Sequence, residues 1–495
     1  MKYVSLKSQS CKVMRECLLS LGCCVLLAGS AYADDARGIT LVQFPNIGGA
    51  PLGAAPLAPQ VQAPTMMDEK VVVPLPATID DVAVGGGGRY LVLYLKKLRK
   101  LAVFDVNKSA VKYLSLTSDT VFFAASSEKL AIVLPEENAI ERYDLANLTR
   151  ELRVALPNEG PVRSAVMGAS SAGPLMVIAD QTNFFDLGTL QEMNVENFDH
   201  KWGTSRGERN AYQVRASADG TVFTGWYNGQ SPSGLNVLQL NGNKIEPHYM
   251  HDSVGYVLPG QDGSRIYASH GMYTPELQAL DPEKFRDVSC IPVFGGTYFL
   301  GITKGSQKGG LGRGGFGGGF GGGFDAALPL DVAVYSVVDR RLLLTIPRLE
   351  ELKATNSNMS WARENMTLEK LIYFFPAANL LITIPDTKDG LVVRKFNLLE
   401  ALEKAGLDYF FVSSTPVPTA RKGQTYSYQI DVKSKRGGVT YSLDSGPPRS
   451  TLSGNGRLVW NVPKDYAMSE ENIIVSIRDA AGQQMFHTFK VRVTP

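Results

Sequence analysis

Four polar residues in one stretch of the chain have side chains suited to metal binding or proton transfer. His248, His251 and Asp252 lie close together, and His270 stands on the next expected strand. Imidazole nitrogens and carboxylates bind metal ions and move protons near neutral pH. No helix is expected that would place His248 and His251 on one face, and no further ligand follows at a typical metal-site spacing. We therefore interpret the stretch as polar loop residues at the edge of a sheet.

Cysteine chemistry depends on a single residue once the N-terminal segment is set aside. Cys11, Cys17, Cys23 and Cys24 lie near the N-terminus, and Cys290 follows alone. If that segment is removed, no internal disulfide can form. No Cys-His motif surrounds Cys290, so we interpret it as a small buried apolar residue rather than a nucleophile.

Two glycine-rich stretches match loose phosphate-loop patterns. A phosphate loop joins a strand to a helix whose N-terminus faces the phosphate. Gly85–Gly88 leads instead into an expected strand at Tyr90–Tyr94, which predicts a turn. The tract Gly309–Phe324 spaces its phenylalanines four apart among glycines, which predicts disorder, with weak adhesive contacts as the alternative. No residue is therefore assigned to catalysis, to a cofactor or to a metal site.

The elements that position these residues are mostly strands, and one strand pattern recurs. Each copy ends in a polar residue flanked by apolar ones, at Asp105, Asp144, Asp186, Gln239, Asp281, Ser336 and Asn397. The intervals are 39, 42, 53, 42, 55 and 61 residues. A four-stranded propeller blade repeats every 40 to 45 residues or so. The longer intervals contain insertions at Asn197–Asn210, Gly309–Phe324 and Arg348–Met366.

A second strand behind a tight turn precedes most copies. These turns begin near Gly85, Ser126, Ser217, Gln261 and Pro376. Glycine or aspartate stands where the backbone must reverse, as in a strand–turn–strand unit. Helical periodicity is confined to Leu398–Ala405 and, as a weaker candidate, Arg348–Thr355. The sequence therefore predicts an all-β fold.

The seven copies resemble the blades of WD40-like or YVTN-like seven-bladed β-propellers, over residues 66–413. The resemblance rests on the strand pattern, because the Gly-His and Trp-Asp signatures of true WD40 repeats are missing. Partner classes of eukaryotic WD40 proteins are therefore not carried over. In such folds an N-terminal strand often completes the last blade, which predicts that role for Val71–Val73.

A second domain is expected over residues 414–495, with a rigid hinge at Pro416-Val417-Pro418 and a new strand pattern that begins at Gly423. It resembles the Ig-like, dystroglycan-type cadherin-like domains of bacterial secreted and surface proteins. The residues that carry the resemblance are Gly423, Tyr426-Ser427-Tyr428, Tyr441-Ser442-Leu443, Pro447-Pro448, Gly456-Arg457-Leu458-Val459-Trp460, Asp479 and Gly482. Trp460 is expected in the core of a β-sandwich.

The resemblance to cadherin-like domains suggests one cofactor, calcium. Some cadherin relatives bind it through clustered acids, whereas Asp444, Asp465 and Asp479 stand singly here. We interpret these aspartates as turn residues that accept hydrogen bonds from backbone amides, with calcium binding as the alternative.

The N-terminus has the pattern of a secretory signal. Lys2, Lys7, Lys12 and Arg15 precede the apolar run Leu18–Ala28, and Ala31-Tyr32-Ala33 follows. The run is too short to span a bilayer, and the pattern predicts residues 1–33 as a signal peptide cleaved after Ala33. Lipidation at Cys23 is the alternative. Residues 34–65 form an expected linker rich in Pro, Ala and Gly. The mature chain has no predicted transmembrane segment.

The charge balance bears on the class of partner. The whole chain has a formal net charge of +2, and residues 1–33 hold four Lys or Arg and one Glu, which leaves −1 for the rest. Nucleic-acid and anionic-membrane surfaces need a basic excess, so the sequence argues against both.

These features favour an exported, non-catalytic binding or scaffold protein of the periplasm, the cell envelope or the cell surface. Its expected partner is a protein or polysaccharide of the envelope. Two alternatives stay open: a propeller enzyme with its site in the central channel, acting as a hydrolase, lyase or oxidoreductase, and a structural component of the envelope.

Overall fold

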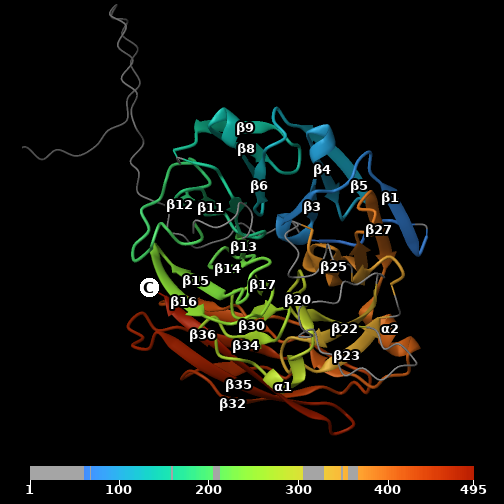
Figure 1. Ribbon diagram of the computed structural model, residues 1–495. Coiled ribbons are helices and arrows are strands. Elements are labelled where there is room, and N and C mark those ends of the chain that lie inside the picture. The colour runs from blue at the N-terminus through green and yellow to red at the C-terminus, as the bar shows by residue number, and fades with distance from the viewer. Residues whose placement is uncertain are drawn as a thin grey trace, which may run out of the picture. The chain divides into compact units, whose positions relative to one another are not determined.

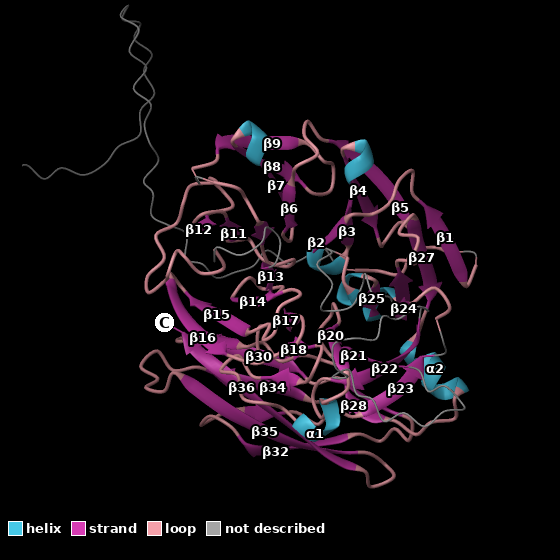
Figure 2. Cartoon of the chain, viewed as in Figure 1, coloured by secondary structure: helices cyan, strands magenta, loops and turns pink. Residues whose placement is uncertain are grey.

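The computed structural model describes residues 61–66, 68–157, 160–204, 212–304, 328–346, 349–354 and 366–494, which all belong to one compact unit. The predictions for the signal peptide, for most of the linker and for Gly309–Phe324 lie outside these residues. Strands dominate the described residues, and the helices are short (Figure 2). No helix in this part of the chain is long and apolar enough to cross a membrane.

Antiparallel sheets fill the chain from Lys70 to Lys395, and we number them in chain order. Sheet 1 contains β2 (Asp81–Gly85), β3 (Tyr90–Leu95), β4 (Lys100–Asp105) and β5 (Ala110–Ser115). Sheet 2 contains β6 (Phe122–Ala125), β7 (Lys129–Leu134), β8 (Ala139–Asp144) and β9 (Arg150–Ala155). Sheet 3 contains β10 (Ser164–Val166), β11 (Leu175–Ile178) and β12 (Thr182–Phe185). Sheet 4 contains β13 (Tyr212–Ala216), β14 (Val222–Tyr227), β15 (Leu235–Asn241) and β16 (Lys244–Met250).

The remaining sheets of this region follow the same order. Sheet 5 contains β17 (Val257–Pro259), β18 (Ile266–Ala268) and β19 (Met272–Tyr273). Sheet 6 contains β20 (Ser289–Pro292), β21 (Tyr298–Lys304), β22 (Leu328–Ser336) and β23 (Leu342–Ile346), with β24 (Lys353–Ala354) beside β22. Sheet 7 contains β25 (Ile372–Phe375), β26 (Leu380–Thr383), β27 (Gly390–Lys395) and β1 (Lys70–Pro74). Short helices join some strands, namely η1 (Gly86–Gly88), η2 (Lys96–Leu98), η3 (Pro135–Glu137), α1 (Pro282–Phe285), η4 (Leu368–Lys370), η5 (Pro376–Ala378) and α2 (Leu398–Lys404).

The recurring polar residue of the sequence marks the turn after the third strand in several sheets. Asp105 and Asp144 are the last residues of β4 and β8. Asp144 Oδ1 accepts hydrogen bonds from the backbone amides of Ala146 at 3.1 Å and Asn147 at 3.0 Å. Asn397 plays a related role, because its side chain caps the N-terminus of α2. At these three positions the repeat arises from side chains that satisfy backbone amides, whereas Gln239 lies within β15 and approaches His248.

The sheets follow one another around a common centre in chain order (Figure 1). The first strands of successive sheets from sheet 1 to sheet 6 contact one another, so these strands are the innermost. β1 pairs with β27 in antiparallel register, with Val72 opposite Val392, which confirms the predicted closing role of Val71–Val73. The architecture is that of a β-propeller, in which radial repetition leaves only short outer sheet edges.

One of the two predicted helices is confirmed and the other is wrong. α2 covers Leu398–Lys404, with Leu398 and Leu402 buried. Lys353–Ala354, within the second candidate, is a strand that pairs with β22. Backbone pairing along the edge of β22 thus outweighs a weak local helical pattern.

The C-terminal strands form a separate set of sheets. β29 (Thr419–Arg421), β36 (Gln484–Thr494), β35 (Glu470–Arg478) and β32 (Thr440–Ser445) form sheet 8, and β30 (Thr425–Gln429), β34 (Arg457–Asn461) and β33 (Thr451–Leu452) form sheet 9. β28 (Phe410–Val412) pairs with β31 (Val432–Ser434), so a strand in the range expected for the propeller has its partner in the C-terminal range. Residues of sheets 8 and 9 share one hydrophobic core, and Trp460 is fully buried in it, as predicted.

Candidate functional site

A cavity of about 950 Å³ lies at the centre of the propeller. Residues from or next to the innermost strand of every sheet from 1 to 7 line it. We call this cavity the channel. Its volume is at the upper end of the range for pockets that hold small ligands.

The innermost strands all run in the same direction along the channel. Backbone hydrogen bonds join the turns that follow these strands, from Gly86 N to Ser126 O, Ser127 N to Ser171 O, Ser170 N to Ala218 O and Asp219 N to Gln261 O. Because each turn directly follows an innermost strand, the carboxyl ends of these strands lie together. The channel therefore has two distinct ends.

We call the end at which the innermost strands begin the charged end. The charged residues that line it are Asp80, Asp81, Lys96, Asp119, Arg163, Glu369, Lys370 and Lys388. Each of them comes just before an innermost strand, is the first residue of one, or lies in a turn at the same end of its sheet. Arg215, on β13, is the remaining charged residue among those lining the channel, and its guanidinium reaches Glu369 at this end.

The ion pair between Arg215 and Glu369 joins sheets that are not neighbours in the ring. Arg215 Nη2 donates to Glu369 Oε1 at 2.8 Å, and Thr367 Oγ1 donates to the same oxygen at 2.7 Å. The guanidinium also lies 5.0 Å from the ring centre of Trp226, a distance suited to a cation–π contact. Glu369 is buried, with its side chain 3% exposed. The pair therefore bridges the channel between sheet 4 and the segment that leads into sheet 7.

A second ion pair closes the ring between sheet 7 and sheet 1. Lys370 Nζ donates to Asp81 Oδ1, and Asp81 Oδ1 also accepts a hydrogen bond from the amide of Val82. Burial lowers the pKa of Lys370, while the nearby carboxylate of Asp81 opposes that shift. The buried ammonium thus depends on its partner to stay charged.

Glu369 keeps one carboxylate oxygen without a partner. Its Oε2 is buried and accepts no hydrogen bond from any described residue. The hydroxyl of Tyr256, which is fully buried next to β17, likewise lacks a partner among the described residues. Unpaired buried polar atoms are uncommon in native proteins and often mark functional sites or ordered water. Glu369 Oε2 belongs to the residue whose other oxygen takes part in the ion pair across the channel.

The opposite end, which we call the glycine end, is closed by backbone. The turn Gly86–Gly88 reaches across it, because Gly87 N donates to the carbonyl of Ala169 in sheet 3 and a Cβ on Gly88 would lie 2.9 Å from Phe294 in sheet 6. The lining residues here include Val84, Ala125, Ala169, Ala218, Pro259 and Phe294, which carry no charge. The prediction of a turn at Gly85–Gly88 is confirmed, and its glycines allow positive φ and close approach of the backbone.

The histidines singled out in the sequence do not form a common site. His248 on β16 approaches Gln239 at 3.0 Å, while His251 Nδ1 lies 2.7 Å from the hydroxyl of Tyr249. Asp252 and His270 are also among the described residues. In this part of the chain, no three or more His, Cys, Asp or Glu side chains lie close enough together to hold a metal ion. The interpretation as polar residues at a sheet edge agrees with these contacts.

Cys290 and the aspartates considered for calcium binding make contacts that are typical of structural residues. Cys290 is fully buried in β20, where burial raises the pKa of its thiol, as expected for an inert core residue. Asp479 is buried and accepts backbone hydrogen bonds from Ala481 and Gln483, both at 3.0 Å, as a turn residue does. Asp444 accepts a hydrogen bond from Ser476 on the neighbouring strand.

The residues that meet in the channel were not identified from the sequence, and neither was one motif. Arg215 and Glu369 are 154 positions apart, and no local pattern links them. A Gly-x-Ser-x-Gly spacing occurs from Gly203 to Gly207, but a nucleophile elbow needs a strand before it and a helix after it. Gly203 lies in a turn, and Ser205 lies outside the described residues.

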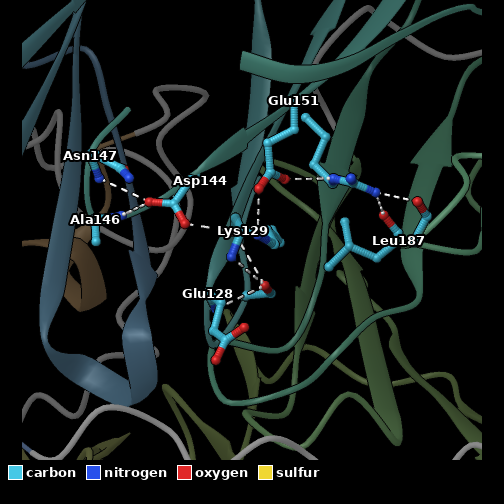
Figure 3. A network of polar contacts seen from close by, with 10 residues as sticks. Glu128, Lys129, Asp144, Ala146, Asn147, Glu151 and Leu187 are labelled. Atoms are coloured by element: carbon cyan, nitrogen blue, oxygen red, sulfur yellow. Dashed lines mark hydrogen bonds and ion pairs between the residues drawn. The ribbon is translucent and has the colours of Figure 1, made fainter. Parts of the chain in front are cut away.

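A second charged network lies away from the channel, on sheet 2 (Figure 3). Lys129 and Arg142 bind the two carboxylate oxygens of Glu151 at 2.7 Å and 3.0 Å. Arg142 Nη1 also donates to the carbonyl of Leu187, next to sheet 3, at 2.8 Å. Because this network joins neighbouring sheets through partly exposed pairs, we assign it a structural role.

The sequence matches no family model and no curated protein. Several solved structures are similar at low identity. The β-propeller domain of Cps50 (Swd1) from Myceliophteria thermophila has 11% identity and a TM-score of 0.40, covering 66% of this chain and 100% of that one. The WD40 repeats of RRP9 have 9% identity and a TM-score of 0.42, covering 68% and 99%. Hydrazine synthase from Kuenenia stuttgartiensis has 11% identity and a TM-score of 0.33, covering 68% and 82%. The assignment of a β-propeller therefore depends on the chain's own sheet topology and on β1, which closes sheet 7.

Proposed function

We propose that this chain is an exported, non-catalytic binding protein. Sheets 1 to 7 act as the blades of a seven-bladed propeller, and the C-terminal sheets act as an Ig-like, cadherin-like module. The N-terminal segment is a signal peptide cleaved after Ala33, and the partner is a protein or polysaccharide of the cell envelope. The basic n-region and the short apolar run support export.

One observation carries the binding function: the charged side chains that line the channel gather at one of its ends. A rigid ring that holds charged groups in fixed positions is a preorganised surface for recognition, since little conformational entropy is lost when a partner binds. The glycine end offers no comparable set of side chains, because backbone groups there bond to one another. The partner therefore docks at the charged end.

The turn that includes η2 extends this surface outward. Lys96, Lys97, Leu98 and Arg99 are all exposed, and Lys97 and Arg99 have no ion-pair partner among the described residues. The acids nearby already have partners: Glu136 accepts from Ser118 and Thr120, and Glu137 pairs with Arg153. A partner with exposed acidic groups fits this turn.

The test compares two variants of sheet 1 with the same change in charge at opposite ends. Lys97 stands in the turn at the charged end, and Lys108 stands in an exposed turn at the glycine end. The full-length tagged chain is expressed in its native host, crosslinked, and recovered from the envelope fraction. We expect Lys97→Glu to lose the captured partner and Lys108→Glu to keep it. Equal capture by both variants would overturn the docking surface, and recovery from the cytosol alone would overturn export.

A second candidate, a propeller enzyme, has one observation in its favour. Carboxylates from Asp81 and Glu369 converge in the channel. In the present arrangement each is bound to a cation, Lys370 or Arg215, so neither is free to accept a proton. Turnover of sugar, lactone or alcohol substrates by the purified chain, abolished by Glu369→Gln, would favour this candidate over binding alone.

A further inference from the structure

His487 is a titratable side chain buried between sheets 8 and 9. It lies on β36, is 2% exposed, and packs against Phe489 with 4.8 Å between the ring centres. Its Nε2 lies 3.1 Å from the hydroxyl of Tyr428, which is on β30 in the facing sheet. Its Nδ1 is buried and has no partner among the described residues. The imidazole therefore joins the two sheets through its contact with Tyr428.

The groups that face His487 favour the neutral ring. On β30, the hydroxyl of Tyr428 is shared with Ser414, whose Oγ lies 2.8 Å away. On β35, the residue opposite His487 is the apolar Val475. From the propeller, Arg265 acts on the ring as a positive charge just before β18 in sheet 5. Burial, together with the charge of Arg265, lowers the pKa of His487 to about 4, so the ring is uncharged at neutral pH.

The strand that carries His487 also holds sheets 8 and 9 against the propeller. Met485, two residues earlier on β36, packs against the hydrophobic cores of both. Near the end of β36, Arg492 Nη1 donates to Asn241 Oδ1 at 2.7 Å. Asn241 is the last residue of β15, at the turn that leads into β16 of sheet 4. A change in the packing of β36 therefore affects the contact between the C-terminal sheets and the propeller.

Protonation of His487 would destabilise this arrangement, because it places a cation in a core with an arginine nearby. An unfolded histidine titrates near pH 6.5, whereas the pKa of His487 in the folded chain is about 4, so the unfolded state binds more protons between these values. The stability contributed by the neutral ring is complete above pH 6.5 and is lost as the pH falls toward 4.

We propose that the contact of sheets 8 and 9 with the propeller is an acid-sensitive joint, which opens when His487 takes up a proton. The propeller itself stays closed, because its ring depends on the pairing of β1 with β27 and not on β36. The inference adds a form of regulation, and it holds whether or not a partner binds at the charged end.

Hydrogen exchange of the purified full chain, measured at pH 7, 5.5 and 4, tests the joint. Rates are corrected for the intrinsic effect of pH and compared between β36 and β3, a propeller strand. We expect protection in β36 to fall about 100-fold more than in β3 between pH 7 and pH 4, the factor that corresponds to the lowered pKa of His487. Small-angle scattering should show an increase in the maximum dimension over the same range, as the C-terminal sheets separate from the ring.

Two variants assign the effect to His487. His487→Phe keeps an aromatic ring that cannot be protonated, so β36 should lose no more protection in acid than β3 does. Arg265→Gln removes the repelling charge from the propeller side, so its acid-dependent loss should be smaller than that of the native chain. His251→Gln, a change at an exposed histidine, serves as the control and should keep the full loss.

The inference is wrong if β36 and β3 of the native chain lose protection equally, or if His487→Phe is as acid-sensitive as the native chain. It is also wrong if β36 loses protection while the maximum dimension stays constant, since the sheets would then unfold in place. If His487→Phe does not fold, Arg265→Gln decides, and an undiminished acid-dependent loss in that variant would overturn the proposal.

Discussion

At the charged end of the propeller channel, ionic side chains bind one another: Arg215 binds Glu369, and Lys370 binds Asp81. At the glycine end, backbone amides bind backbone carbonyls. Side chains carry charge and can select a ligand. Backbone groups are the same in every residue, so they can seal a ring but distinguish little. One end of this channel is therefore closed by backbone, and the other has the side chains that the proposed recognition requires.

Loss of one partner in the cross-channel ion pair should have the largest effect on stability. Arg215→Met leaves the buried carboxylate of Glu369 without its cation, which costs about 3 kcal/mol of unfolding free energy. Arg142→Met, in the partly exposed network of sheet 2, should cost less, about 1 kcal/mol, because Glu151 is 27% exposed and keeps its ion pair with Lys129. Chemical denaturation of both variants measures the difference.

The double variant Arg215→Met/Glu369→Gln serves as the control for the first prediction. It removes the orphan charge, so it should be more stable than Arg215→Met alone. A double variant that is less stable would show that Arg215 acts through packing on Trp226 rather than through charge.

The glycine end should be sensitive to a single methyl group. An added Cβ on Gly168 would lie 2.4 Å from Gly220 N and 2.6 Å from Ala218 O, both backbone atoms of sheet 4. Gly168→Ala should therefore lower the unfolding free energy by about 2 to 3 kcal/mol, the range for overpacking. Gly454→Ala, where no atom lies within 4 Å, provides the matched substitution. Equal melting temperatures for the two variants would refute close backbone packing at this end.

The fold was largely predictable from the sequence because its signals are local. Asp144 accepts a hydrogen bond from the amide of Asn147, three positions away, and Gly87 has a positive φ that glycine adopts readily. In both cases the residue type alone indicates a turn. β-branched residues at Val71–Val73 indicated the closing strand.

The site was not predictable, because its partners come from distant segments. Lys370 and Asp81 are 289 positions apart, and only ring closure brings them together. His248 and His251 are three positions apart in sequence but contact different residues, because His248 lies on β16 and His251 follows the end of that strand. Sequence spacing predicts a site only when the local element is known.

The buried ammonium of Lys370 should give the charged end a measurable pH dependence. Burial lowers its pKa below the ordinary value of 10.5, so the unfolded chain binds more protons as pH approaches that value. The unfolding free energy of the native protein should therefore rise with pH, relative to Lys370→Met, in the window below 10.5. Denaturation of both proteins from pH 8 upward, at constant ionic strength, measures the difference; parallel curves would contradict the shift.

The exposed turn at the charged end should matter for binding and not for stability. Lys97→Glu and Lys108→Glu each change an exposed side chain, so each should alter the unfolding free energy by no more than about 0.5 kcal/mol. A large loss of stability in Lys97→Glu would mean that its effect on partner capture reports misfolding rather than recognition.

Capture of the partner by Lys97→Glu and Lys108→Glu tests the central claim most directly, because the two variants make the same change in charge at opposite ends of the channel. We predict that Lys97→Glu, at the charged end, loses the partner and that Lys108→Glu, at the glycine end, keeps it. Equal capture by both variants, or loss in Lys108→Glu alone, would contradict the account.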